Sequence, residues 1–153
     1  MVAIKESELN NVIGPRHPVG VVVFDSEQKK VLLVKHGPKA SRKEGLFGIP
    51  GGRPRPLETV ADAALRELAE ETGIAAERQH LIRLGGVYRG ILKRENGDKH
   101  YLLDVVIATS HSGELTKSDE TEPLWANIHT LNRRKRLMPS VEDIVNDALR
   151  MVK

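Results

Sequence analysis

Three glutamates near the middle of the chain have the residue type and the spacing to bind a metal ion. Glu67, Glu70 and Glu71 stand at positions i, i+3 and i+4, so on a helix their carboxylates lie close together. Like charges at that spacing repel each other, and the helix gains nothing from them unless cations bind. Hard carboxylate oxygens suit Mg²⁺ or Mn²⁺. We therefore expect a divalent metal site here, with a solvated acidic face as the alternative.

The segment around these acids predicts a glycine turn that leads into a helix. Gly51-Gly52 comes first, and Thr59 followed by Asp62 is typical of an N-cap with its capping-box partner. Apolar residues then recur at helical spacing and predict one buried face: Val60, Ala61, Ala64, Leu65 and Leu68. We expect the helix to cover about residues 59–73, with Gly73 as a left-handed C-cap.

The spacing of this segment resembles the Nudix box, the signature of the Nudix hydrolase family. The pattern is glycine, five residues, glutamate, seven residues, arginine-glutamate, an aliphatic residue, any residue, a glutamate pair, any residue, glycine and an aliphatic residue. Every required position is filled, by Gly52, Glu58, Arg66-Glu67, Leu68, Glu70-Glu71, Gly73 and Ile74. The resemblance is specific, because seven fixed positions coincide by chance about once in 10⁸ starting points at average residue usage.

The resemblance implies hydrolysis of a nucleoside diphosphate linked to another moiety X, by attack of water on phosphorus. It implies a Mg²⁺ cofactor, with Mn²⁺ as the alternative ion. The implied metal ligands are Glu67, Glu70, Glu71 and the backbone carbonyl of Gly51. Glu58 and Arg66 would then be structural, with Arg66 orienting the acids of the box through charge-assisted hydrogen bonds.

The general base is expected outside the box. Asp119, Glu120 and Glu122 lie just ahead of the expected last strand, where family members often place this base or a further metal-binding acid. We favour Glu120 as the additional catalytic residue beside Glu67, Glu70 and Glu71. An ordinary solvated acidic loop and a shared role with a box glutamate are the alternatives.

Basic side chains close to the glycine turn are candidates for binding phosphates. They are Lys39, Arg42, Lys43, Arg53 and Arg55. Arg53 is the best single candidate, because it directly follows Gly52. The alternative is that these residues serve solubility, since surface lysines and arginines are common.

The remaining sequence supplies the elements that must position this site. Strands are expected at 17–24 and 30–34 as a hairpin, at 81–92 and 100–109 around an Asn96-Gly97 turn, and at 123–128. Residues 1–16 form a lead-in segment, and a C-terminal helix is expected over about 140–152. This order agrees with the α/β (α+β) fold that the resemblance implies. That fold is a Nudix-type αβα sandwich around a mixed β-sheet, in one domain over residues 1–153.

Composition limits the compartment and the partners. With 153 residues, 29% charged and 39% hydrophobic, the chain reads as a globular protein without a transmembrane or secretory segment. The absence of cysteine excludes thiolate chemistry and fits a cytoplasmic protein.

We expect a small nucleoside diphosphate derivative as partner and no membrane. At 3%, aromatic residues are too few for a nucleic-acid stacking platform. A homodimer is compatible with the sequence, which leaves the oligomeric state open.

The identity of X is left open by the sequence. Arg89 stands where many ADP-ribose-cleaving members carry a proline, and Phe47, Tyr88 and Tyr101 serve packing as well as they would serve base stacking. A second reading is a catalytically silent Nudix-fold module that binds a nucleotide for regulation. Turnover in the presence of metal would separate the two.

Overall fold

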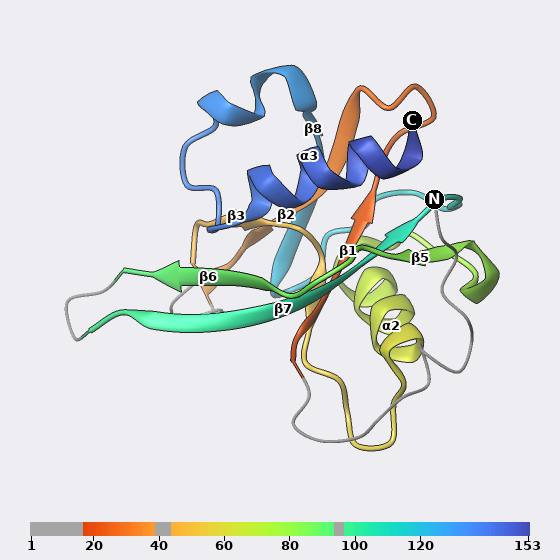
Figure 1. Ribbon diagram of the computed structural model, residues 1–153, viewed down its shortest axis with the longest axis horizontal. Coiled ribbons are helices and arrows are strands. Elements are labelled where there is room, and N and C mark those ends of the chain that lie inside the picture. Colours follow the sequence, from red (N-terminus) through yellow and green to blue (C-terminus); the bar gives the residue numbers. More distant parts are fainter. Residues whose placement is uncertain (1–16, 39–43, 94–96) are drawn as a thin grey trace.

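The computed structural model describes residues 17–38, 44–93 and 97–153 (Figure 1). Within this part of the chain there is a five-stranded mixed sheet and a three-stranded antiparallel sheet. The first has the order β4 (Gly51–Gly52), β1 (Val19–Val23), β7 (Lys99–Ala108), β5 (Leu81–Arg83), with β6 (Tyr88–Leu92) also paired to β7. The second has the order β3 (Phe47–Gly48), β2 (Lys30–His36), β8 (Thr121–Asn127). Among the strands of the described residues, only β1 and β7 pair in parallel.

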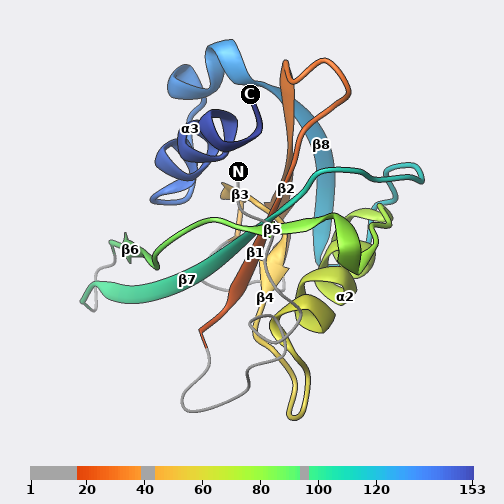
Figure 2. The ribbon, with the colours of Figure 1, turned by 45° about the vertical axis from the view of Figure 1, so that its right-hand side comes forward.

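Helices α2 (Val60–Thr72) and α3 (Val141–Val152) lie on opposite sides of the strands (Figures 1 and 2). Val19, Val21 and Val23 of β1 pack in one core cluster with α2. Val22 and Phe24 belong to a second cluster, with α3. Both faces of β1 are therefore buried, which explains its continuous apolar sequence. The predicted sandwich of helices around a mixed sheet is confirmed.

Neither α-helix in the described ranges combines the length and the apolar character that a membrane span requires. Two short 3₁₀ segments, η2 (Arg78–His80) and η3 (Ile128–Arg133), precede β5 and follow β8.

The predicted hairpin of residues 17–24 and 30–34 is wrong. β1 pairs with β4 and β7, whereas β2 pairs with β3 and β8, and only an isolated bridge from Phe24 to Val31 joins the two strands. The later strands form longer ladders, with five residue pairs between β1 and β7 and seven between β2 and β8. The turn between residues 24 and 30 did not decide the pairing, because β7 and β8, which are distant in the chain, bury β1 and β2.

The predicted single strand over residues 81–92 is also wrong, because the chain breaks into β5 and β6. Gly85 and Gly86 lie between them, and Gly86 has a φ of 83°, which favours glycine. β6 then pairs with β7 in the expected antiparallel hairpin, which projects from the body in Figure 1. Its expected turn lies partly outside the described residues, since Asn96 is not among them.

The ends of α2 are as predicted. The Thr59 hydroxyl accepts from the Asp62 amide at 3.0 Å, the Asp62 carboxylate accepts from the Thr59 amide at 3.2 Å, and Gly73 is left-handed with a φ of 81°. At α3 the helix begins at Val141, and the Ser140 hydroxyl does not cap it. That hydroxyl donates instead to the carbonyl oxygen of Arg89 in β6, at 2.6 Å.

Replacing Leu57 by asparagine should stabilise the protein. Leu57 has a φ of 69° and is 91% exposed, so a strained backbone carries a side chain that buries almost nothing. Asparagine tolerates this conformation, and we expect the free energy of unfolding to rise by about 0.5–1 kcal/mol. Urea titration measures the change. Ile91→Asn, at an exposed strand position, is the control and should lower stability. A loss of stability in Leu57→Asn would contradict the argument.

Candidate active site

The side chain of Arg66 on α2 holds the acidic cluster together. Its Nε donates to Glu58 Oε2 at 2.7 Å and its Nη2 donates to Glu58 Oε1 at 2.9 Å, a two-point contact. The two side chains are only 15% and 16% exposed. These hydrogen bonds lower the pKa of Glu58 from 4.5 to about 2 and raise the pKa of Arg66. The pair is therefore fully ionised at neutral pH.

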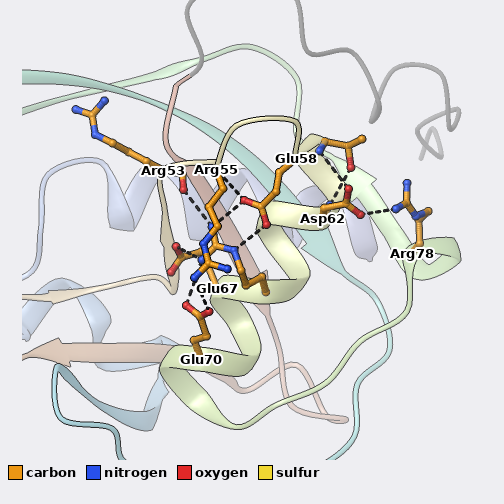
Figure 3. Close-up of polar contacts among 9 residues, drawn as sticks. Arg53, Arg55, Glu58, Asp62, Glu67, Glu70 and Arg78 are labelled. Atoms are coloured by element: carbon orange, nitrogen blue, oxygen red, sulfur yellow. Dashed lines mark hydrogen bonds and ion pairs between the residues drawn. The ribbon is translucent and has the colours of Figure 1, made fainter.

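The same guanidinium reaches the next two acids of the box. Arg66 Nη1 donates to Glu67 Oε1 at 2.8 Å and to Glu70 Oε2 at 3.1 Å. Its Nη2 also donates to the carbonyl oxygen of Arg53, at 3.2 Å, in the loop after β4. Arg55 adds a second cation, with 3.4 Å between its Nη2 and Glu70 Oε1 (Figure 3). One arginine thus connects three carboxylates of the predicted site to the glycine loop.

The glycines of β4 allow the strand to approach these acids closely. The Gly51 amide donates to Glu71 Oε1 at 2.7 Å. A Cβ on Gly51 would lie 2.2 Å from the carbonyl oxygen of Val19, and a Cβ on Gly52 would lie 2.5 Å from Glu67 Oε1. Side chains at these two positions would therefore separate β4 from β1 and from α2.

Replacing Gly52 by alanine should disturb the cluster by displacing Glu67. We expect metal affinity to fall about 10–100-fold, the usual cost of losing a group that orients a ligand. Titration with Mn²⁺, followed by electron paramagnetic resonance, measures this without turnover. Gly85→Ala is the matched control, because no atom lies within 4 Å of its added Cβ. Unchanged Mn²⁺ affinity in Gly52→Ala would show that the contact with Glu67 has no role in metal binding.

The donor set of this cluster fits a divalent cation. The Arg66 guanidinium contacts Glu58, Glu67 and Glu70, and the Arg55 guanidinium contacts Glu70. Glu71 adds a fourth carboxylate beside Gly51. In the described ranges, no three acids or histidines converge closely enough to hold an ion together. The contacts explain this, because Arg66 lies against Glu67 and Glu70 while Glu71 turns to the Gly51 amide. The assignment of Glu67, Glu70, Glu71 and Gly51 as ligands stays a prediction.

A pocket of about 610 Å³ adjoins the glycine strand, within the range of small-molecule sites. Gly51, Gly52 and Arg53 line its edge beside the box. In Figure 3 the Arg53 side chain points away from the acidic cluster. The apolar walls of the pocket come from Pro18, Ile49, Leu92, Leu102, Leu103, Met138, Pro139, Val141 and Ile144. Of the predicted phosphate-binding residues, Arg53 is thus at a pocket, whereas Lys39 and Arg42 lie outside the described residues.

The structure places Glu120 on a loop that is fixed to the end of α2. The Gly37 amide donates to the Glu120 carbonyl at 2.8 Å, and the adjacent Thr121 hydroxyl donates to the Glu71 carbonyl at 2.9 Å. Glu120 lines a second pocket, of about 720 Å³, that shares His36 with the first. Glu120 therefore lines a space next to the one lined by Gly51, Gly52 and Arg53. Its role as general base stays a prediction.

The aromatic residues that the sequence left open have different surroundings. Tyr101 lines the pocket, its hydroxyl donates to the Pro139 carbonyl at 3.0 Å, and burial raises its pKa to about 12. Tyr88 packs against the cluster of α3 and donates to Asp147 Oδ2 at 2.7 Å. Phe47 has the Arg134 guanidinium 5.0 Å from its ring centre. Only Tyr101 of the three is placed to contact a ligand in this pocket.

Sequence reasoning missed the basic residues that the β6–β7 hairpin contributes to the pocket. Arg89, Lys99 and His100 all line it. Isolated basic residues in strands give no signal until the strand register is known. Their position depends on the pairing of β6 with β7, which places Arg89 opposite Leu102, Ile91 opposite His100 and Leu92 opposite Lys99.

Comparisons with a family model, with known sequences and with solved structures all match this chain to Nudix proteins. A family model described as the NUDIX domain matches residues 14–147. An ADP-ribose pyrophosphatase from Methanocaldococcus jannaschii is 32% identical over 96% of this chain and 82% of that protein. Nucleoside diphosphate-linked moiety X motif 6 from Mus musculus is 30% identical over 80% of this chain, which spans only 39% of the mouse protein. The crystal structure of a MutT NUDIX hydrolase from Burkholderia pseudomallei has a TM-score of 0.66 at 29% identity, over 88% of this chain and 98% of that one.

Proposed function

Because this chain is a pyrophosphohydrolase of the Nudix family, we propose that it uses a divalent metal ion to hydrolyse the diphosphate of a nucleoside diphosphate linked to X. The observation that carries this proposal is the contact of the box acids with β4. Glu71 is hydrogen-bonded to Gly51, Glu67 lies against Gly52, and both glycines line the pocket of about 610 Å³. The acids of the box and the pocket therefore both contact β4.

In this proposal Glu67, Glu70, Glu71 and the Gly51 carbonyl hold Mg²⁺ or Mn²⁺. When bound, the ion supplies positive charge to the diphosphate and makes bound water more acidic. Arg66 keeps Glu58, Glu67 and Glu70 in place through its hydrogen bonds. Arg53, at the pocket edge, binds a phosphate, and Glu120 or a box glutamate accepts the proton of the attacking water.

The names of two similar proteins bear on the identity of X. The Methanocaldococcus jannaschii relative is an ADP-ribose pyrophosphatase, and the Burkholderia pseudomallei structure is a MutT hydrolase. We propose an ADP-ribose-type, nucleotide-sugar or nucleoside triphosphate substrate, with the first supported by the name of the Methanocaldococcus jannaschii relative. We also propose a cytoplasmic location, which suits a protein without cysteine.

A hydrolysis screen in which the products are separated by chromatography tests the function. The panel contains nucleoside triphosphates, 8-oxo-dGTP, ADP-ribose, nucleotide sugars and dinucleoside polyphosphates, each with Mg²⁺, with Mn²⁺ and with EDTA. We expect metal-dependent turnover of at least one compound, abolished in Glu71→Gln. Silence from folded protein that binds Mn²⁺ would count against the hydrolase and favour a nucleotide-binding regulatory module. Turnover in EDTA would overturn the metal assignment.

A further inference from the structure

The last turn of α2, which carries Glu71, is bonded to the loop that leads into β8. A helix ends with carbonyl groups that have no partner inside the helix. Two such groups of α2 accept hydrogen bonds from this loop and the start of β8. The Thr116 amide donates to the Thr72 carbonyl at 2.8 Å, and the Thr121 hydroxyl donates to the Glu71 carbonyl at 2.9 Å. The second hydrogen bond reaches a residue of the predicted metal site.

Thr121 carries a buried hydroxyl at the first position of β8. Among the described residues, only Thr72 and Thr121 are polar and buried, and Thr121 is 3% exposed. Burying a hydroxyl costs free energy unless it is hydrogen-bonded. Valine has nearly the same shape, suits a strand and would be buried without that cost. What threonine adds at this position is therefore the hydrogen bond to Glu71.

The Thr121 hydroxyl is oriented by Ser118, whose hydroxyl oxygen lies 3.0 Å away. Because the single hydroxyl hydrogen of Thr121 is directed at Glu71, Ser118 is the donor in this contact. The Ser118 oxygen accepts in turn from the amides of Thr121 and Glu120, at 3.0 and 3.3 Å. The Glu120 carbonyl accepts from the Gly37 amide, just after β2, at 2.8 Å. The hydroxyl that reaches Glu71 is thus held on a fixed loop.

Glu71 is held by its side chain and by its backbone. Its Oε1 accepts from the Gly51 amide of β4 at 2.7 Å, while its carbonyl oxygen accepts from Thr121 of β8. β4 belongs to the five-stranded sheet and β8 to the three-stranded sheet. Glu71 therefore connects the two sheets, and its carboxylate has little freedom to move. Groups that fix a metal ligand in this way contribute to metal affinity.

We propose that Thr121 is a positioning residue of the metal site. Its hydroxyl holds the last turn of α2 where the Glu71 carboxylate reaches both the Gly51 amide and the ion. This rests on the proposed function only in taking Glu71 as a metal ligand. Thr121 acts through the Glu71 backbone and contacts neither the ion nor the substrate. Removing the hydroxyl lets the last turn shift, whereas serine keeps the hydrogen bond.

Manganese binding tests this without turnover. Free Mn²⁺ is followed by electron paramagnetic resonance while wild type, Thr121→Val and Thr121→Ser are titrated. We expect Thr121→Val to bind Mn²⁺ about tenfold more weakly than wild type. Thr121→Ser should stay within about twofold of wild type, because it retains the hydroxyl. Thr109→Val is the matched control and should bind Mn²⁺ like wild type. The Thr109 hydroxyl also donates to a backbone carbonyl, that of His80 at 3.0 Å, outside the acidic cluster.

A second background separates positioning of Glu71 from a general loss of stability. In Glu71→Gln, where the positioned charge is already gone, Thr121→Val should lower Mn²⁺ affinity by less than about twofold. Should Thr121→Val fail to fold, Ser118→Ala takes its place, because it removes the group that orients the Thr121 hydroxyl. Its expected loss of Mn²⁺ affinity is about threefold.

The outcomes distinguish this inference from the proposed function. Wild-type Mn²⁺ affinity in Thr121→Val, or in Ser118→Ala where that variant replaces it, overturns the role of Thr121. An equal loss in the wild-type and Glu71→Gln backgrounds overturns it as well, and so does a wild-type protein that binds no Mn²⁺. The expected pattern of Mn²⁺ affinities without turnover in the hydrolysis screen leaves the role of Thr121 intact and overturns the hydrolase.

Discussion

A Glu71→Gln variant should fold like the wild-type protein and lose about 10³-fold in kcat, the usual effect of removing one group that stabilises charge in the transition state. The structure indicates why the fold should survive. Glu71 Oε1 accepts from the Gly51 amide at 2.7 Å, and a glutamine oxygen accepts the same hydrogen bond. What disappears is the negative charge, which a metal ligand in this cluster requires.

The control for Glu71→Gln is Glu27→Gln. Glu27 is an exposed acid paired with Lys29, far from α2 in the chain, and its loss should leave kcat unchanged. Mn²⁺ affinity, kcat and thermal stability are measured for both variants. If Glu71→Gln keeps wild-type kcat at saturating Mg²⁺, Glu71 is not a catalytic residue. If its melting temperature falls sharply, the contact with Gly51 depends on charge, and the variant would not report on metal binding.

The elements predicted correctly from the sequence are those fixed by neighbours in the chain. The Thr59–Asp62 capping box and the left-handed Gly73 are local signals, so both ends of α2 were predictable. The pairing of β1 with β7 joins Val19 to Asp104, and no short segment encodes such a choice. The expected hairpin of β1 and β2 failed for this reason.

The candidate site likewise has one part that the sequence predicts and one part that only the fold brings together. The box residues are close in sequence, so their grouping on α2 follows from helical spacing. The pocket combines residues from before β1, from the β6–β7 hairpin and from the start of α3. The hairpin residues line it only because β5 and β6 separate at Gly85-Gly86 and β6 then pairs with β7. The helical spacing of the acids does not predict the contacts of Arg66 with Glu67 and Glu70. The resemblance to the Nudix box implied that Arg66 orients these acids.

Replacing Arg66 by leucine should cost about 3 kcal/mol of stability, because it leaves two partly buried carboxylates without their partner. Glu58 and Glu67 are 16% and 15% exposed, and both lose charge-assisted hydrogen bonds. Arg66→Lys keeps the charge but cannot form the two-point contact with Glu58, so it should restore only part of the loss. Differential scanning calorimetry at pH 7 measures all three proteins.

The pH dependence distinguishes a broken ion pair from a packing defect. In the folded protein the pKa of Glu58 is lowered from 4.5 to about 2 by the hydrogen bonds from Arg66. A lowered pKa stabilises the fold fully above pH 4.5, and the contribution is lost as the pH falls toward 2. The difference in the free energy of unfolding between wild type and Arg66→Leu should therefore be constant from pH 7 to 5 and should shrink between pH 4.5 and 2. In a Glu58→Leu background, Arg66→Leu should cost about 2 kcal/mol less. The opposite result is a stability difference that stays constant down to pH 2, with the same loss from Arg66→Leu in the wild-type and Glu58→Leu proteins. It would mean that Arg66 stabilises α2 by packing and not through its ion pair with Glu58.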